Sequence, residues 1–267
     1  MSDLLDETFF LPAQTEIDRA VNYPYDAPDT AFVFDNGRLR SLDDAAILYD
    51  RTAVLSVGSN RAPVQLRRKF GDDAIIPVTP AVLHDCDIVH AAQLGYYGAV
   101  PCTAFPAAGC EVRLNVAWLD EAQLEIMHRT EAVGVAYDYI RFNGGTVTHL
   151  PVPDAGGEII SGYQPVFGYA ARGGVLDIGA GQPAGLSRIP AKERIFETMS
   201  QAEAAALVRQ LTGHDDHRSL EEFVADMQAD RAERRLILER LSAHMLFAEQ
   251  APWQIIEIQL DAVDASV

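Results

Sequence analysis

An apolar run that ends abruptly at a Gly-Ser-Asn turn is the feature that most constrains how this chain can fold. Residues 52–57, Thr-Ala-Val-Leu-Ser-Val, have the composition of a buried strand, and the run stops at Gly58-Ser59-Asn60. A short helix is predicted over 61–70, with Pro63 in its first turn. Such a junction directs several backbone N–H groups at one place, which suits a carboxylate or a developing oxyanion. A positive φ or a close backbone approach is expected at Gly58.

Charge and composition exclude several classes of partner. A formal net charge of −18 over 267 residues argues against binding to phosphate backbones or anionic membrane surfaces. No apolar stretch approaches the roughly 18–20 residues of a membrane-spanning helix, and the acidic N-terminus lacks a signal-peptide pattern. Cys86, Cys102 and Cys110 are odd in number and lie mostly in apolar surroundings, which favours free thiols. We therefore expect a cytoplasmic protein that binds neither nucleic acid nor membrane.

The pattern along the chain predicts one structural domain with additions at both ends. Residues 1–50 are expected to form an N-terminal extension that packs on the core, with a hairpin at Asp35-Asn36-Gly37. Residues 51–190 are expected to form that core, in which strands are predicted over 112–118, 137–142 and 146–150. Successive strands with few helices between them favour a mainly antiparallel sheet closed into a barrel.

The C-terminal region, 191–267, is predicted to be helical with a final strand. Ser200 and Ser219 each begin a helix as the first residue of a capping box. The second helix is expected to be the longer one and to continue until Pro252 stops it. Alternation of apolar and polar residues over 256–260 predicts the last strand.

Glu131 lies at the end of another short helix, predicted over 120–131. Asp120 is expected at its N-cap, and apolar residues at helical spacing face the core. A carboxylate at such a helix end suits a general base or acid. Taken alone, Glu131 is one glutamate among many, and its position relative to the other motifs gives it weight.

Short motifs follow the Gly-Ser-Asn turn in a fixed order. They are the segment 99–109, the strand 112–118 and the helical segment 124–131. In this order they resemble the gamma-glutamylcyclotransferase family. Its members carry Tyr-Gly-Ser-Asn after a first strand, a Thr-bearing strand ending in Pro-Gly, a strand of the form Val-x-Gly-x-Val/Leu-Trp/Tyr, and a helix ending in Leu-Asp-x-x-Glu-Gly. The segment 178–186 is similar to the Gly-Ala…Gly-Leu-Pro segment of the family, so the resemblance covers about 55–190.

Three positions depart from the family pattern. Val57 replaces the Tyr of the first motif, Arg61 replaces the usual Leu after Asn, and Ala132 replaces the Gly after the catalytic Glu. The last two departures are compatible with the fold. Loss of the Tyr hydroxyl removes one donor from the pocket, which bears on the identity of the substrate more than on the chemistry.

The resemblance implies an α+β fold: a small, mainly antiparallel β-barrel of gamma-glutamylcyclotransferase type with flanking helices and a helical C-terminal extension. It implies that Glu131 is the catalytic proton-transfer residue. It also implies a set of substrate-binding residues: Val57, Gly58, Ser59, Asn60, Thr103 and Tyr139. The substrate would be a small γ-glutamyl or amino-acid-like molecule whose α-amine attacks its own γ-carbonyl, releasing 5-oxoproline and a free amine. No metal or cofactor is required, because the nucleophile belongs to the substrate.

Two classes of function stay open at this point. One is an enzyme of this type, and the other is a relative that hydrolyses a different amide or only binds an amino-acid-like ligand. The segment 175–181 resembles the first motif of a methyltransferase, but Pro183 interrupts its glycine pattern and the following chain is helical. The additions at the two ends either roof the substrate pocket, cover a sheet face or form the interface of a homodimer.

Overall fold

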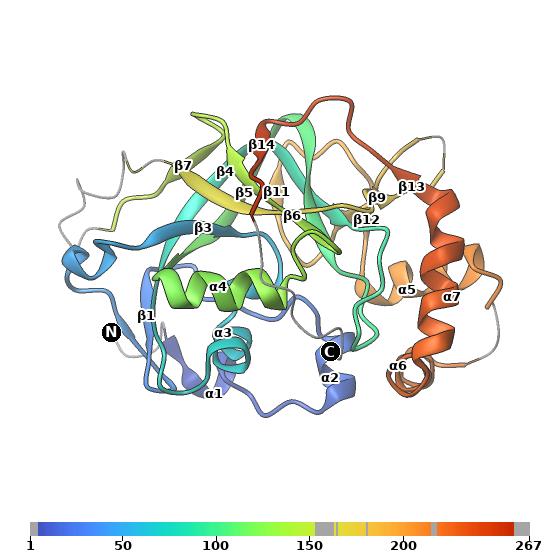
Figure 1. Ribbon diagram of the computed structural model, residues 1–267, viewed down its shortest axis with the longest axis horizontal. Helices are drawn as coiled ribbons and strands as arrows, with labels where there is room; N and C mark the ends of the chain where they lie inside the picture. The colour runs from blue at the N-terminus through green and yellow to red at the C-terminus, as the bar shows by residue number, and fades with distance from the viewer. Residues whose placement is uncertain (1–4, 153–162, 164, 180, 215–217, 259–267) are drawn as a thin grey trace.

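A large, mostly antiparallel sheet forms the centre of the fold, with helices packed against it (Figure 1). The computed structural model describes residues 5–152, 163, 165–179, 181–214 and 218–258. The strands are paired in the order β12 (Thr198–Met199), β10 (Gly185–Leu186), β4 (Ile75–His90), β5 (Cys102–Leu119), β3 (Thr52–Ser56), β8 (Val166–Ala171), β6 (Tyr137–Phe142) and β14 (Trp253–Ile255). The α+β class is therefore confirmed. Within the described residues the pairing follows an open path, so the closed barrel stays a prediction.

The remaining strands join this path at its sides or pair separately. They are β1 (Phe32–Asp35), β2 (Arg38–Ser41), β7 (Val147–His149) and β11 (Ala191–Lys192) in the main sheet, and β9 (Val175–Leu176) with β13 (Met245–Leu246) as a separate pair. The two longest strands, β4 and β5, pair along most of their length, and a bulge between His84 and Cys86 bends β4. β3 lies between β5 and β8, so the Gly-Ser-Asn turn leaves the sheet from a central strand.

The hairpin predicted near the N-terminus is confirmed. β1 and β2 are antiparallel partners, and the turn between them places Asn36 at φ 49° and Gly37 at φ 72°. Positive φ at both central residues is the requirement of the two-residue turns that best match strand twist, and Asn-Gly meets it at low cost. β1 also pairs with β4, so the N-terminal segment contributes strands to the main sheet as well as packing on it.

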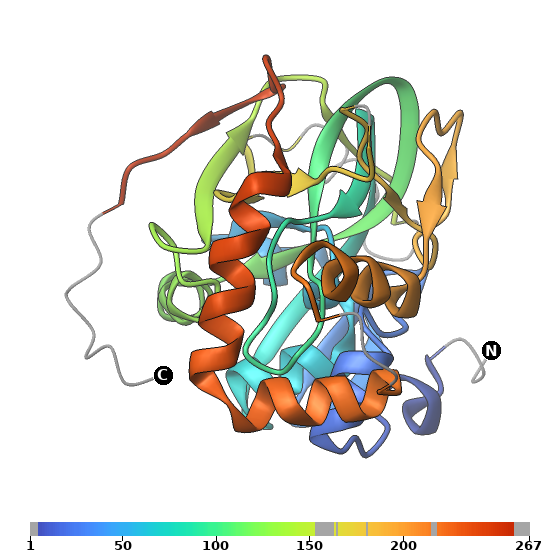
Figure 2. The ribbon, with the colours of Figure 1, turned by 90° about the vertical axis from the view of Figure 1, so that its right-hand side faces the viewer.

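Five of the seven α-helices in the described residues form two groups. The described α-helices are α1 (Glu7–Phe10), α2 (Glu16–Val21), α3 (Pro63–Phe70), α4 (Glu121–Thr130), α5 (Gln201–Leu211), α6 (Leu220–Ala229) and α7 (Arg231–Leu241). Figure 1 shows α3 and α4 side by side beneath β3, and Figure 2 shows α5, α6 and α7 gathered at one end of the molecule. Leu66 of α3 and Met127 of α4 share one apolar cluster with Val54 of β3, which fixes both helices on the strand that leads into the turn.

The long helix predicted from Ser219 to Pro252 is wrong, because the chain breaks it at Asp230. Asp230 has φ −115° and ψ 98°, and its Oδ1 accepts hydrogen bonds from the N–H groups of Ala232 and Glu233. An aspartate within a charged run can thus act as the N-cap of a new helix instead of continuing the old one. α7 then ends at Leu241. None of the helices in the described residues is long and apolar enough to cross a bilayer.

The final strand lies earlier than predicted. β14 spans Trp253–Ile255 and pairs with β6, whereas 256–258 belong to no strand and 259–260 lie outside the described residues. Trp253 and Ile255 alternate with Gln254, but Ile256 follows Ile255 directly, so the alternation over 256–260 is shifted by one residue from that of β14. The strand predicted over 256–260 is therefore wrong over 256–258, and the observed strand lies directly before it.

A buried ion pair ties β4 to the segment that follows β11. The Asp87 side chain is 0% exposed, and Arg194 donates to both of its carboxylate oxygens at 2.8 Å. Arg194 also donates to the carbonyl oxygen of Ile189 at 2.7 Å. Because the carboxylate of Asp87 is shielded from water, its charge is stabilised mainly by the two hydrogen bonds from Arg194.

Replacing Arg194 by methionine should therefore lower the free energy of unfolding by about 3–5 kcal/mol, since Asp87 would be left as an unpaired buried charge. Denaturant unfolding measures the loss. The matched control is Arg188→Met, which breaks a pair with Asp26 whose side chains are 46% and 42% exposed. That control should cost less than about 1 kcal/mol. Equal losses in the two variants would contradict the structural role of the buried pair.

Candidate active site

The Gly-Ser-Asn turn joins the end of β3 to α3. Gly58 has φ −127° and ψ −129°, so it does not adopt the left-handed conformation. The other expected reason for glycine, a close approach, is what the structure shows. A Cβ at this position would collide with Tyr23 Oη and lie 2.8 Å from Cys102 Sγ. Glycine is needed here because the turn rests directly on two side chains from distant parts of the chain.

The side chains of Tyr23 and Cys102 lie directly beneath the turn and contact each other. Tyr23 Oη accepts a hydrogen bond from the N–H of Cys102 at 3.1 Å and lies 3.2 Å from Cys102 Sγ. The thiol lies 3.6 Å from the carbonyl oxygen of Val57, to which it donates. Burial raises the pKa of Cys102 to about 12, so the thiol stays protonated at neutral pH. The nearest cysteine to the turn is therefore a structural group and a poor nucleophile.

The turn presents unused backbone donors. After Gly58 the chain forms one turn of 3-10 helix, Ser59–Arg61, with no side chain capping its start. In the part of the chain that the structure describes, the N–H groups of Gly58, Ser59 and Asn60 donate to no acceptor. Consecutive free N–H groups on a tight turn make a concave site for an anionic oxygen.

Glu131 lies at this turn, as the resemblance implies. It is the C-cap of α4, and its Oε1 accepts a hydrogen bond from Asn60 Nδ2 at 2.9 Å. The same oxygen forms an ion pair with Lys69 Nζ, from the last turn of α3. The side chains of Lys69 and Glu131 are only 7% and 13% exposed. The carboxylate is thus held in place by one neutral and one charged donor.

The second oxygen of Glu131 is open. Oε2 has no hydrogen-bond partner within the described residues, although the carboxylate is largely buried. A carboxylate that is fixed through one oxygen and open at the other can exchange a proton with a ligand without losing its position. This arrangement fits a general base.

The local sequence accounts for the placement of Glu131. Asp120 caps α4, and Gln123 returns a hydrogen bond to the backbone of Asp120, so the predicted helix start is confirmed. At the other end Ala132 has φ 48°, the left-handed conformation that ends many helices. Glycine is the residue that adopts this conformation most easily, which gives a physical reason for the glycine that the family pattern carries here.

Lys69 is the site residue that the sequence did not reveal. It belongs to a run of three basic residues at the end of α3, where positive side chains are favoured by the helix dipole. That general preference gave no sign that one of the three turns inward to Glu131. Only its residue type was unusual, because the chain contains just two lysines, Lys69 and Lys192.

Phenol groups surround the carboxylate. Burial, followed by the negative charge of Glu131, raises the pKa of Tyr137 well above its usual value. Burial, followed by the charges of Tyr25 and Glu131, does the same for Tyr97. In the described part of the chain neither Tyr97 nor Tyr137 has a hydrogen-bond partner for its hydroxyl. Both stay protonated and can donate to a ligand.

The other predicted site residues have different surroundings. Val57 is buried and contributes its carbonyl oxygen to the Cys102 contact. Thr103 is buried in β5, and its Oγ1 accepts a hydrogen bond from the N–H of Ala171 at 3.1 Å, which joins β5 to β8. Tyr139 stacks on Phe167 with ring centroids 5.1 Å apart. The structure thus brings Glu131, Asn60, Ser59, Gly58 and Val57 together, while the Thr103 hydroxyl is occupied between strands.

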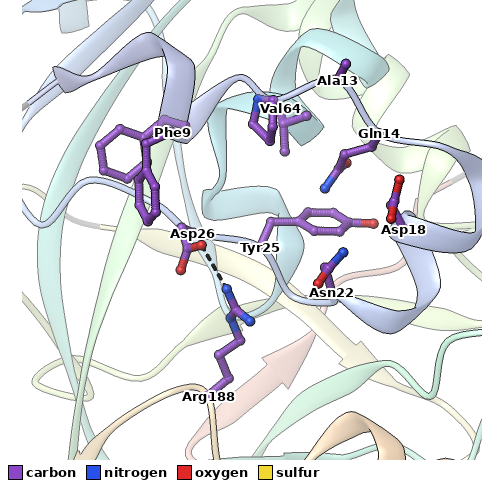
Figure 3. A pocket seen from close by; sticks show the side chains of 11 residues that line it. Phe9, Ala13, Gln14, Asp18, Asn22, Tyr25, Asp26, Val64 and Arg188 are labelled. Atoms are coloured by element: carbon purple, nitrogen blue, oxygen red, sulfur yellow. Dashed lines mark hydrogen bonds and ion pairs between the residues drawn. The ribbon is translucent and has the colours of Figure 1, made fainter.

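Two surface cavities lie near these elements. One, of about 630 Å³, includes Tyr139 and Val133 and borders the end of α4. The other, of about 230 Å³, is formed by the N-terminal segment against the start of α3, and Figure 3 shows Tyr25 between Val64 on one side and Asn22 on the other. An ion pair between Arg188 and Asp26 lies on its edge. Neither cavity is lined by Glu131 or by the turn itself.

The close approach at Gly58 predicts a specific loss of stability. Gly58→Ala should lower the free energy of unfolding by about 1–3 kcal/mol, because the added methyl group overpacks the contact with Tyr23 and Cys102. Gly144→Ala is the matched control, since a Cβ there meets nothing within 4 Å and the residue is exposed. It should change stability by less than about 0.5 kcal/mol. A Gly58→Ala protein as stable as the control would show that the turn does not rest on these side chains.

Comparison with known proteins adds little to this geometry. No protein-family model matches the chain, and no curated protein matches it. Among solved structures, the chain is similar to an uncharacterized human protein, loc79017, with a TM-score of 0.33 and 13% sequence identity, over 78% of this chain and 95% of that one. A similarity this weak carries no argument about function, which must be argued from the site itself.

Proposed function

We propose that this chain is a gamma-glutamylcyclotransferase-like enzyme, which cleaves a γ-glutamyl amide and releases 5-oxoproline and a free amine. Under this proposal the sheet corresponds to the small β-barrel of that family, carried mainly by residues 51–190. The observation that carries the proposal is the contact between Asn60 and Glu131, which are 71 residues apart in sequence. These residues belong to the two motifs on which the family resemblance depends, and each alone is weak.

The first step of the proposed reaction uses the open oxygen of Glu131. Oε2 accepts a proton from the substrate's α-amine as its nitrogen forms a bond to the γ-carbonyl carbon of the same molecule. The product of this step is a tetrahedral five-membered ring. Because amine and carbonyl belong to one molecule, the protein needs only to hold the substrate in a folded conformation.

The turn supplies hydrogen-bond donors for the negative charge that develops on the substrate. As the γ-carbonyl oxygen becomes an oxyanion, the free N–H groups of Gly58, Ser59 and Asn60 donate to it. The hydroxyls of Tyr97 and Tyr137 are further protonated donors in the surroundings of Glu131. When the ring carbonyl re-forms, the bond to the leaving nitrogen breaks, and Glu131 returns its proton to the departing amine. Protons balance, and the carboxylate is regenerated.

The direct test is an assay for 5-oxoproline with a panel of γ-glutamyl amines and γ-glutamyl peptides. Glu131→Gln keeps the hydrogen bonds to the side chain but cannot accept a proton, so turnover should fall at least about a hundredfold while the fold persists. Glu125→Gln is the matched control on the same helix, because Glu125 is 56% exposed and pairs with Arg129 on the surface.

The outcomes separate the proposal from its competitors. Release of 5-oxoproline by the wild-type protein, lost with Glu131→Gln and kept with Glu125→Gln, supports a cyclotransferase. Release of free glutamate from the same panel indicates an amide hydrolase on the same site. A protein that binds these compounds without cleaving any of them, or a Glu131→Gln variant that keeps wild-type turnover, contradicts the proposed mechanism.

A further inference from the structure

We propose that Lys69 and Glu131 together recognise the α-amino-acid head of the ligand, with Glu131 Oε2 binding the α-amine and Lys69 Nζ binding the α-carboxylate. The inference rests on the proposed function for the identity of the ligand. It also assigns separate roles at the site: the N–H groups of the turn bind the γ-carbonyl oxygen, and Lys69 binds the α-carboxylate.

The donors of Lys69 are not all used. Nζ carries three protons, and in the described part of the chain it makes two contacts, the ion pair with Glu131 and a weak hydrogen bond to Met127 Sδ at 3.4 Å. A thioether sulfur is a poor acceptor, so the ammonium group reaches only one strong partner. Its side chain is 7% exposed, so the ammonium group has lost most of its contact with bulk water.

A buried ammonium with incomplete hydrogen bonding is costly, because it has lost water that the protein does not fully replace. An acceptor supplied by a ligand would remove that cost. A carboxylate fits best, since its bond to an ammonium group is charge-assisted.

The shape of the pair suits an amino acid. In an α-amino-acid head the amine and the carboxylate are bonded to the same carbon, and on the protein the ammonium of Lys69 lies beside the carboxylate of Glu131. When the amino-acid head lies beside the Lys69–Glu131 pair in the opposite orientation, its amine faces the carboxylate of Glu131. Its carboxylate then faces the ammonium of Lys69. The Asn60 bond to Oε1 keeps Oε2 in the fixed position that this match requires.

Three small acids test the proposal without any reaction. L-glutamate carries the whole head and a γ-carboxylate that mimics the oxyanion at the turn. L-isoglutamine replaces the α-carboxylate by a carboxamide, and glutarate lacks the α-amine. Calorimetry on the wild-type protein should show L-glutamate binding at least about tenfold more tightly than either analogue.

Single variants test which residue causes each of the two preferences. Lys69→Met should abolish the preference for L-glutamate over L-isoglutamine and keep that over glutarate. Glu131→Gln should do the reverse. Lys192→Met is the matched control, because Lys192 is the other lysine and is 82% exposed; it should bind like the wild type. If Lys69→Met fails to fold, the double variant Lys69→Met/Glu131→Gln removes both charges together and should lose both preferences.

The results distinguish this inference from the proposed function. An undiminished preference for the α-carboxylate in Lys69→Met, or in the double variant, overturns the role of Lys69 even if the protein releases 5-oxoproline. Binding of L-glutamate with both preferences assigned as described supports the inference even if no γ-glutamyl compound is cleaved. A wild-type protein that binds none of the three acids at millimolar concentration overturns it.

Discussion

The site depends on a single acceptor, the Oε1 atom of Glu131, which receives donors from two other parts of the chain. Asn60 brings the turn after β3, and Lys69 brings the end of α3, to the C-cap residue of α4. One of the two contacts is charge-assisted and both are poorly exposed to water, so they are stronger than equivalent contacts on a surface. With Oε1 fixed in this way, the direction of Oε2 and its relation to the free N–H groups of the turn are set by the same three elements.

Sequence reasoning succeeded where the signal was local. The Asn36-Gly37 turn, the capping box at Asp120 and the helix after Pro63 each place a residue type where backbone geometry demands it. The ends of these elements therefore lay close to their predicted places. The prediction that Asn60 and Glu131 lie close together required more than local signals. It came from an order of motifs that resembles that of a known family.

The features that the sequence did not reveal have different physical origins. Asp230 begins a new helix because its side chain binds two N–H groups, although its charged neighbours are equally compatible with one continuous helix. Gly58 is required by contact with Tyr23 and Cys102, and no local pattern records a contact with residues so far away in sequence. Lys69 escaped for the same reason, since the turn of a long side chain inward or outward is decided by what the tertiary fold places beside it.

The two side chains beneath the turn connect the site to the N-terminal segment. Tyr23 comes from the N-terminal segment and Cys102 from the start of β5, and Gly58 lies against both of them. Tyr23 and Cys102 are 79 residues apart, so their contact depends on the tertiary fold and not on local structure. The N-terminal segment is thus part of the support of the site, because its Tyr23 lies against the turn. Removal of that segment would therefore take away one of the two side chains on which the shape of the turn depends.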